Sequence, residues 1–225
     1  MKDWCIEVWG DYACFTRPEM KVERVSYDVM TPSAARAIFG AILWKPAIKW
    51  HILRIEVSNP IKWISVRRNE VSAVAGERSN GVYIEDNRTQ KAGLFLRDVR
   101  YRIYAWFEFI PPEKRKHQNR WTFCFDDEQD QSAETEAKYA AMFERRAKKG
   151  QCFYRPYLGC REFSCYFKLV ENSDDVKPID INADLGWMLY DMQHEHTENP
   201  VPEFFKARLE NGILHTDRRH VEVRS

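Results

Sequence analysis

Cysteine and histidine are the residues of this chain that could bind a metal or act as nucleophiles, and the sequence holds six of each. No two cysteines form a C-x-x-C pair, and Cys160 and Cys165 have four residues between them, which is poor spacing for zinc. Because the N-terminus lacks an apolar signal region, we expect reduced thiols that pack as small apolar residues. His194-Glu195-His196 could supply two or three ligands of a metal site. Without further ligands nearby, the segment is interpreted as a solvated loop. The sequence therefore predicts no metal and no other cofactor.

The net charge of +1 conceals an asymmetry along the chain. Residues 1–120 carry a net charge of +7, residues 121–170 are balanced, and residues 171–225 carry −6. A basic first part is typical of a protein that holds a polyanion with one region of its fold, although ordinary solvated surface gives the same pattern. No apolar run reaches the roughly 18 residues of a membrane span, so we expect no membrane partner and a cytoplasmic location.

Four segments have the alternation, or the β-branched and aromatic content, that is typical of strands. The expected strands cover residues 5–9, ending at Gly10, then 50–57 with 61–66 as its continuation, 94–110 and 163–170. The polar residues 67–91 are interpreted as a long excursion or hairpin. Beyond residue 171, short strands at 185–190 and 204–215, turning at Asn211-Gly212, predict a small β appendage.

Two helices complete the expected fold. The first begins with Thr31 as N-cap and Pro32 at the first helical position. Its apolar residues recur at helical spacing and predict a buried face: Ala35, Ile38, Phe39, Ile42 and Leu43. The second is expected from a cap at Ser132 to about Lys149, before Gly150. The β-α-β-β-α-β order predicts an α+β, ferredoxin-like domain over residues 1–170, with a β-hairpin insertion at about 67–92. Residues 171–225 would form a small acidic, β-rich region.

Three blocks of sequence lie in order within residues 5–170. They read ERVSYDVMTPSAAR (23–36) with WKP (44–46), NRTQ (87–90) with LRDV (96–99), and EAK (136–138) with RR (145–146), GQCF (150–153) and RPYLGCREF (155–163). With these blocks the chain resembles the type I-C CRISPR-associated proteins (Dvulg subtype, fifth Cas family). The resemblance implies a RAMP-type, RRM-like fold that binds the CRISPR repeat RNA and cuts the precursor without a metal. It also implies that the protein then stays on the 5′ handle, beside the backbone and large subunits of the interference complex.

Metal-independent RNA cleavage uses the substrate's own 2′-hydroxyl as nucleophile and leaves a 2′,3′-cyclic phosphate. It needs a base near that hydroxyl, a cation near the phosphate and an acid for the departing 5′-oxygen. The resemblance places a tyrosine at the end of the first helix and a Lys-His pair on the second, where this chain has Leu43, Lys138 and Tyr139. Lys138 and Tyr139 are therefore the catalytic candidates. A phenol titrates at about pH 10 and an imidazole at about 6.5, so slow cutting is expected. Two alternatives are left by the sequence: Tyr139 only packs on a buried helical face, or His117 takes the place of the missing catalytic histidine.

Basic residues, most of them in or beside the three blocks, are candidates for contacts to RNA phosphates. They are Lys45, Arg88, Arg97, Arg145, Lys149, Arg155 and Arg161. Trp44, Tyr154 and Tyr157 are candidates for stacking on unpaired bases, although core packing is the commoner fate of such rings. The leading hypothesis is a repeat-specific endoribonuclease. Its rival is a subunit that holds the RNA handle without cutting it, which the departures at Leu43 and Tyr139 favour more than the sequence of a typical family member would. Binding of duplex DNA is compatible with either hypothesis.

Overall fold

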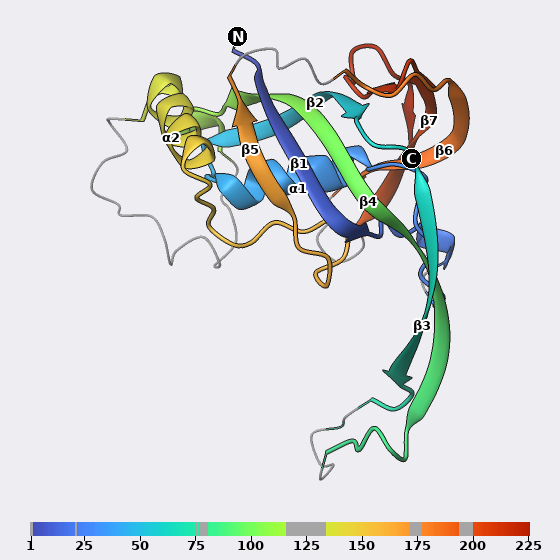
Figure 1. Ribbon diagram of the computed structural model, residues 1–225. Helices are drawn as coiled ribbons and strands as arrows, with labels where there is room; N and C mark the ends of the chain where they lie inside the picture. The colour runs from blue at the N-terminus through green and yellow to red at the C-terminus, as the bar shows by residue number, and fades with distance from the viewer. Residues whose placement is uncertain are drawn as a thin grey trace.

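The computed structural model describes residues 2–20, 22–74, 76, 81–115, 134–171, 177–193 and 200–225. Within these ranges the protein is an α+β structure with two α-helices packed on an antiparallel sheet (Figure 1). The helices are α1 (Pro32–Ile42) and α2 (Glu136–Lys148), and short 3₁₀ turns are η1 (Pro18–Met20) and η2 (Pro112–Lys114). The strands are β1 (Trp4–Ala13), β2 (Ile48–Val57), β3 (Lys62–Val71), β4 (Arg88–Phe109), β5 (Tyr166–Val170), β6 (Ala183–Gln193), β7 (Val201–Glu210), β8 (Ile213–His215) and β9 (Val223–Arg224).

The described strands join in one sheet with the order β5-β1-β4-β2-β8-β7-β6, while β3 pairs with β4 and β9 pairs with β7. The register sets Ile103 opposite both Ile6 and Ile55, so the three side chains point to the same face of the sheet. All three are fully buried. The C-terminal strands continue the same sheet through β8, which pairs with β2.

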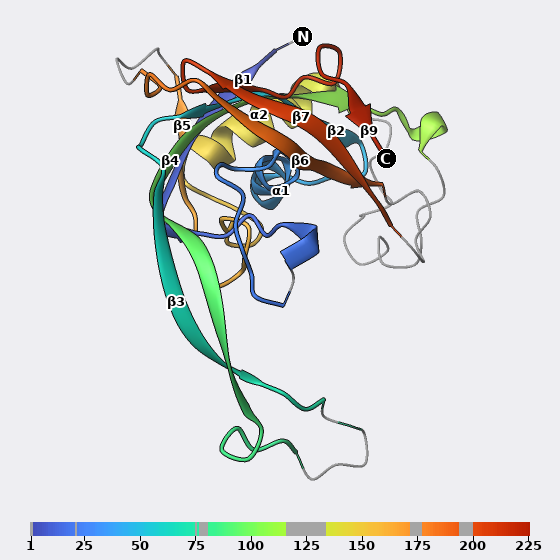
Figure 2. The same cartoon turned by 90° about the vertical axis from the view of Figure 1, so that its right-hand side faces the viewer.

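Helix α1 begins and buries its face as the sequence predicts. The hydroxyl of Thr31 accepts a hydrogen bond from the Ala34 amide at 3.3 Å, and Pro32 occupies the first helical position. The predicted apolar face is buried, and Phe39 stacks on Phe143 of α2 with ring centroids 5.5 Å apart. Figure 2 shows β6 and β7 passing over α1, where Arg36 forms an ion pair with Asp191 at 2.7 Å. The curved sheet therefore covers α1 from two sides.

Two strand predictions need correction. The first strand does not end at Gly10, because Gly10 pairs with Val99 of β4 and pairing continues to Ala13. Residues 61–66 do not continue the second strand, because Pro60 lacks an amide hydrogen and the following strand β3 pairs instead with the first half of β4. The β3–β4 hairpin projects from the body of the molecule (Figures 1 and 2). Its pairing confirms the hairpin interpretation of the polar stretch.

The tight turn expected at Asn211-Gly212 is confirmed. Both residues have positive φ, 50° and 75°, which suits asparagine and glycine. The turn joins β7 to β8, and Leu209 pairs with Leu214 across it.

Helix α2 begins three residues later than predicted. Its N-cap is Thr135, whose hydroxyl accepts a hydrogen bond from the Lys138 amide at 3.2 Å, whereas Ser132 lies outside the described residues. Both residues have the hydroxyl that a cap requires, so the sequence alone did not distinguish them. We expect Thr135→Ala to lower the free energy of unfolding by about 1 kcal/mol, because it leaves an amide at the helix start without its partner. Urea denaturation measures the change, and Ser132→Ala is the matched control that should leave stability unaltered. A larger loss in the Ser132 variant would contradict this assignment.

Candidate nucleic-acid interface and catalytic site

The start of α2 is tied to the end of β4 by a polar network. The hydroxyl of Tyr139 donates to Oε1 of Glu134 at 2.5 Å, and the guanidinium of Arg115 pairs with the other oxygen of that carboxylate. Arg115 also donates through Nε to the carbonyl of Ile110 at 3.0 Å. Burial opposes ionisation of Glu134, but the hydrogen bonds from Arg115 and Tyr139 outweigh it and hold the pKa of Glu134 below its ordinary value. The network therefore contains an ionised carboxylate at neutral pH.

The two catalytic candidates differ sharply in accessibility. Lys138 is exposed on the first turn of α2, and its charge helps to lower the pKa of the nearby Glu134. Tyr139 is only 4% exposed, and its ring lies 6.1 Å from that of Phe109. The ring of Tyr139 thus packs in the core while its hydroxyl belongs to the polar network. Both roles considered for Tyr139 from the sequence, packing and chemistry, are compatible with this position.

The loop after α1 adjoins the end of β4. The amide of Ile110 donates to the carbonyl of Ala47 at 2.8 Å, which brings residues 43–47 beside the strand end that carries the network. The side chain of Leu43 is fully buried, and its carbonyl accepts a hydrogen bond from the Trp50 indole at 2.9 Å. Lys45 is half-buried. We call residues 43–47, 110–115 and 134–139 together the helix-end site.

An exposed aromatic cluster lies beside the C-terminal end of α1. Trp44, Phe153 and Tyr154 are 54%, 64% and 46% exposed. The amide of Phe153 donates to the carbonyl of Ala41 at 2.8 Å, and Arg146 of α2 donates to the carbonyl of Ile42 at 3.0 Å. These two bonds fix the aromatic segment and α2 to the last turn of α1. The sequence pointed to Trp44 and Tyr154 but missed Phe153 and Arg146, although both belong to the third block.

The remaining basic candidates fall in three regions of the structure and not on one track. Arg145 and Lys149 are exposed on or just after α2. Arg88 and Arg97 lie on β4, within the projecting hairpin. Arg155 and Arg161 are exposed in the segment before β5, where the Arg155 guanidinium lies 5.2 Å from the centre of the Tyr166 ring. RNA that contacted all three regions would have to cross the molecule from α2 to the hairpin.

Histidine and cysteine contribute little to the site in the part of the chain that the structure describes. His117 and His194-Glu195-His196 lie outside the described residues. His51 stacks on Trp106 at 4.5 Å on the sheet face opposite to the one that carries Trp50 and the helices. Over the described ranges, no cluster of three potential metal ligands occurs, and the five cysteines found there are free thiols.

No helix in the described residues is long and apolar enough to cross a membrane.

These features define a class of protein: an antiparallel α+β fold whose helix ends present cations and exposed aromatic rings, a combination suited to a polyanion. The chain belongs to the Cas_Cas5d family of CRISPR-associated proteins (Cas_Cas5), whose family model matches residues 5–217. The resemblance seen in the three sequence blocks is thereby confirmed.

Named relatives and a solved structure agree with this membership. CRISPR pre-crRNA endoribonuclease Cas5d of Mannheimia succiniciproducens is 45% identical over 226 residues, which cover 93% of this chain and 92% of the relative. The protein of the same name from Thermus thermophilus is 37% identical over 228 residues, covering 93% of this chain and 89% of that relative. The crystal structure of a CRISPR-associated protein superposes with a TM-score of 0.69 at 25% identity, covering 100% of this chain and 97% of that one.

Proposed function

We propose that this protein is a CRISPR pre-crRNA endoribonuclease that binds the repeat RNA and cuts it without a metal ion. The names of the two relatives support this reaction. The observation in this chain that carries it is the first turn of α2, where exposed Lys138 adjoins Tyr139, whose hydroxyl is hydrogen-bonded to the ionised Glu134. A cation and a hydroxyl–carboxylate pair are the groups that in-line attack of a 2′-hydroxyl requires.

In the proposed reaction the 2′-oxygen attacks the adjacent phosphorus and the bond from phosphorus to the 5′-oxygen breaks. Lys138 stabilises the negative charge that develops on the phosphate oxygens. The Tyr139–Glu134 pair takes up the proton that leaves the 2′-hydroxyl and returns one proton to the departing 5′-oxygen. The products are a 2′,3′-cyclic phosphate and a 5′-hydroxyl, so proton and charge balance without any cofactor. A phenol, with its pKa of about 10, is a weak base at neutral pH, and slow cutting follows.

We assign RNA binding to the basic and aromatic residues around the helix-end site. Lys45, Arg145 and Lys149 would contact phosphates there, while exposed Trp44, Phe153 and Tyr154 offer stacking surfaces for unpaired bases. Arg155 and Arg161, then Arg88 and Arg97 on the hairpin, would contact more distant parts of the RNA. After cutting, the protein would stay on the 5′ handle beside the backbone and large subunits of the interference complex, in the cytoplasm. Duplex DNA is a further candidate ligand of the basic surface.

The architecture suits this role if the first part of the chain is a ferredoxin-like unit. We propose that β1, α1, β2, β4, α2 and β5 form it, because the strand order β5-β1-β4-β2 with its two helices is that of the βαββαβ motif. The β3–β4 hairpin is then an insertion into this unit. Residues 1–170 would form the RNA-binding domain, and residues 171–225 the β-rich region that extends its sheet.

A second candidate function is a subunit that holds the RNA handle and does not cut. The burial of Leu43 and Tyr139 favours it, since the first has no reactive group and the second presents little surface to a substrate. The two candidates share the RNA ligand and differ only in chemistry, so a cleavage assay separates them.

The proposed function is tested by incubating the purified protein with its cognate repeat RNA in EDTA. We expect cleavage at one position within or beside the repeat hairpin, at a rate that added magnesium does not change by more than about twofold. An RNA of scrambled sequence and equal length is the control and should stay intact. Binding without cleavage would support the handle-binding candidate, and cleavage that requires magnesium would contradict the mechanism.

A further inference from the structure

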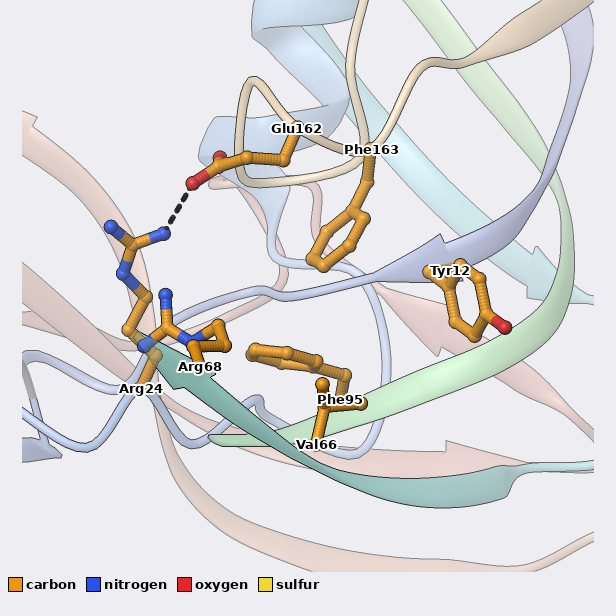
Figure 3. Close-up of a pocket in the computed structure, with 7 residues that line it drawn as sticks. All are labelled: Tyr12, Arg24, Val66, Arg68, Phe95, Glu162 and Phe163. Atoms are coloured by element: carbon orange, nitrogen blue, oxygen red, sulfur yellow. Dashed lines mark hydrogen bonds and ion pairs between the residues drawn. The ribbon is translucent and has the colours of Figure 1, made fainter. Parts of the chain in front are cut away.

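A pocket of about 300 Å³ lies at the foot of the β3–β4 hairpin, outside the helix-end site (Figure 3). Its walls come from segments far apart in the sequence: the end of β1, the loop before α1, both strands of the hairpin, and the segment before β5. Of the seven residues that line it, the six used in the argument below are Tyr12, Arg24, Arg68, Phe95, Glu162 and Phe163. Its volume is at the lower end of the roughly 300–1,000 Å³ of small-molecule sites, which limits its occupant to a single ring system.

Three aromatic rings form the apolar part of the pocket. Phe95 and Phe163 meet edge to face with centroids 5.2 Å apart, and Tyr12 lies 6.0 Å from Phe163. Phe95 is 3% exposed, whereas Tyr12 is 43% exposed at the rim. Phe95 owes its position to Gly93, because a Cβ at residue 93 would lie 2.5 Å from Cζ of the Phe95 ring. The ring thus lies over a strand position that has no side chain, and any larger residue there would displace it.

Two arginines form the polar side of the same pocket. Arg24 pairs with Glu162 at 2.7 Å, as Figure 3 shows, and Arg68 pairs with Glu70 at 2.9 Å through Nη1. Within the part of the chain that the structure describes, the buried Nε and Nη2 of Arg68 have no hydrogen-bond partner. Buried donors without acceptors are destabilising, so such groups in a native protein call for an explanation. Each arginine is already paired with one carboxylate, Arg24 with Glu162 and Arg68 with Glu70, so the donors that an anionic acceptor in the pocket would satisfy are the Nε and Nη2 of Arg68.

We propose that this pocket binds one unpaired nucleotide of the RNA, with its base among Tyr12, Phe95 and Phe163 and its phosphate at Arg24 and Arg68. The proposal rests on the RNA binding proposed above. Unpaired bases stack on aromatic rings and on guanidinium planes, while phosphates accept hydrogen bonds from arginine, and the pocket combines both kinds of group within the space of one nucleotide. Glu162 would give up Arg24 to the phosphate on binding, and its carboxylate would then discourage a second phosphate.

The test compares the effect of removing one base from the RNA in the wild-type protein with its effect in a variant that lacks one aromatic ring of the pocket. Repeat RNA carrying a 2′-deoxynucleotide at the cut position, so that it binds but is not cut, is prepared with an abasic site at each unpaired position in turn. Dissociation constants are measured by fluorescence anisotropy for the wild type and for Phe163→Ala. At one position we expect the abasic site to weaken wild-type binding by about 5- to 150-fold, the range for loss of one stacked base, and to weaken the variant by less than about twofold.

Two further variants make the result decisive. Gly93→Ala leaves every residue that lines the pocket in the sequence but displaces the Phe95 ring, so an abasic site should again weaken binding by less than about twofold. This variant serves if Phe163→Ala does not fold. Trp187→Ala, which removes an exposed ring from β6, should keep the full abasic penalty. Equal penalties in wild type and both pocket variants at every position would overturn the proposal while leaving RNA binding intact. The proposal would also be overturned if the pocket variants bound the RNA like the wild type and lost only their binding to other protein subunits. Failure of the wild type to bind the repeat RNA at all would instead overturn the proposed function.

Discussion

Replacing Lys138 with alanine should lower the single-turnover rate of RNA cleavage by about 10²–10³-fold, the loss typical for removal of one group that stabilises transition-state charge. Lys138 is exposed on the first turn of α2, directly beside Tyr139 and close enough to Glu134 to affect its pKa. Its ammonium can therefore reach a phosphate that approaches the helix start. Affinity for the RNA should fall by much less, about tenfold at most, because the other basic residues of the surface remain.

Arg145→Ala is the matched control for this experiment. Arg145 lies two turns further along the same helix and is exposed, so its loss should weaken RNA binding without slowing the chemical step at saturating protein. Lys138→Arg keeps the positive charge and should restore part of the rate. Equal losses of affinity and rate in Lys138→Ala would assign this residue to phosphate binding, and the account of catalysis given above would be wrong.

The second large effect is expected from Tyr139→Phe, which removes one oxygen atom. The hydroxyl donates to Glu134 at 2.5 Å, and the ring packs near Phe109. Phenylalanine keeps the packing but cannot exchange a proton, so the cleavage rate at saturating protein should fall by about 10²–10⁴-fold. Thermal denaturation should show only a small change, because Arg115 still pairs with the carboxylate of Glu134.

Comparison with Arg115→Ala distinguishes a residue that takes part in proton transfer from one that only stabilises the start of α2. Arg115 contacts Glu134 but offers no group for proton transfer, so its loss should cost stability at the start of α2 and reduce the rate less than Tyr139→Phe does. A Tyr139→Phe protein that cuts at the wild-type rate would show that the residue only packs. The handle-binding function, or a group outside the described residues such as His117, would then be favoured.

The fold was largely accessible from the sequence because its signals are local. Thr31 and Pro32 predicted the start of α1, and the apolar spacing from Ala35 to Leu43 predicted its buried face; both are confirmed. Pairing partners are not local, and therefore the attachment of β3 to β4, with Lys62 opposite Arg97, could not be predicted from residues 61–66 themselves. The N-cap of α2 was predicted at Ser132 and lies at Thr135, because both side chains carry the hydroxyl that a cap requires.

The site was accessible only in part, for the same reason. The sequence pointed to Lys138 and Tyr139 through neighbours in one helix, but it could not show that Arg115 and Glu134 complete the network from both sides of residues 116–133. Leu43, by contrast, was predicted on the buried face of α1 and is fully buried, which argues against restoring a tyrosine there, since overpacking a core position costs about 1–3 kcal/mol. The pocket at the hairpin foot is built from five separate segments, so no motif within any one of them predicts it.

The central claim, that this protein cuts RNA by attack of the substrate's own 2′-hydroxyl, is tested most directly by one substitution in the substrate. A repeat RNA with a single 2′-deoxynucleotide immediately before the cut position lacks the nucleophile and is otherwise unchanged. We predict that it binds with the affinity of the all-ribose RNA and is not cut at that position, while the all-ribose RNA yields a product that mass spectrometry identifies as a 2′,3′-cyclic phosphate. Cleavage of the deoxy substrate at the same position, leaving a 3′-hydroxyl or a 5′-phosphate, would contradict the account.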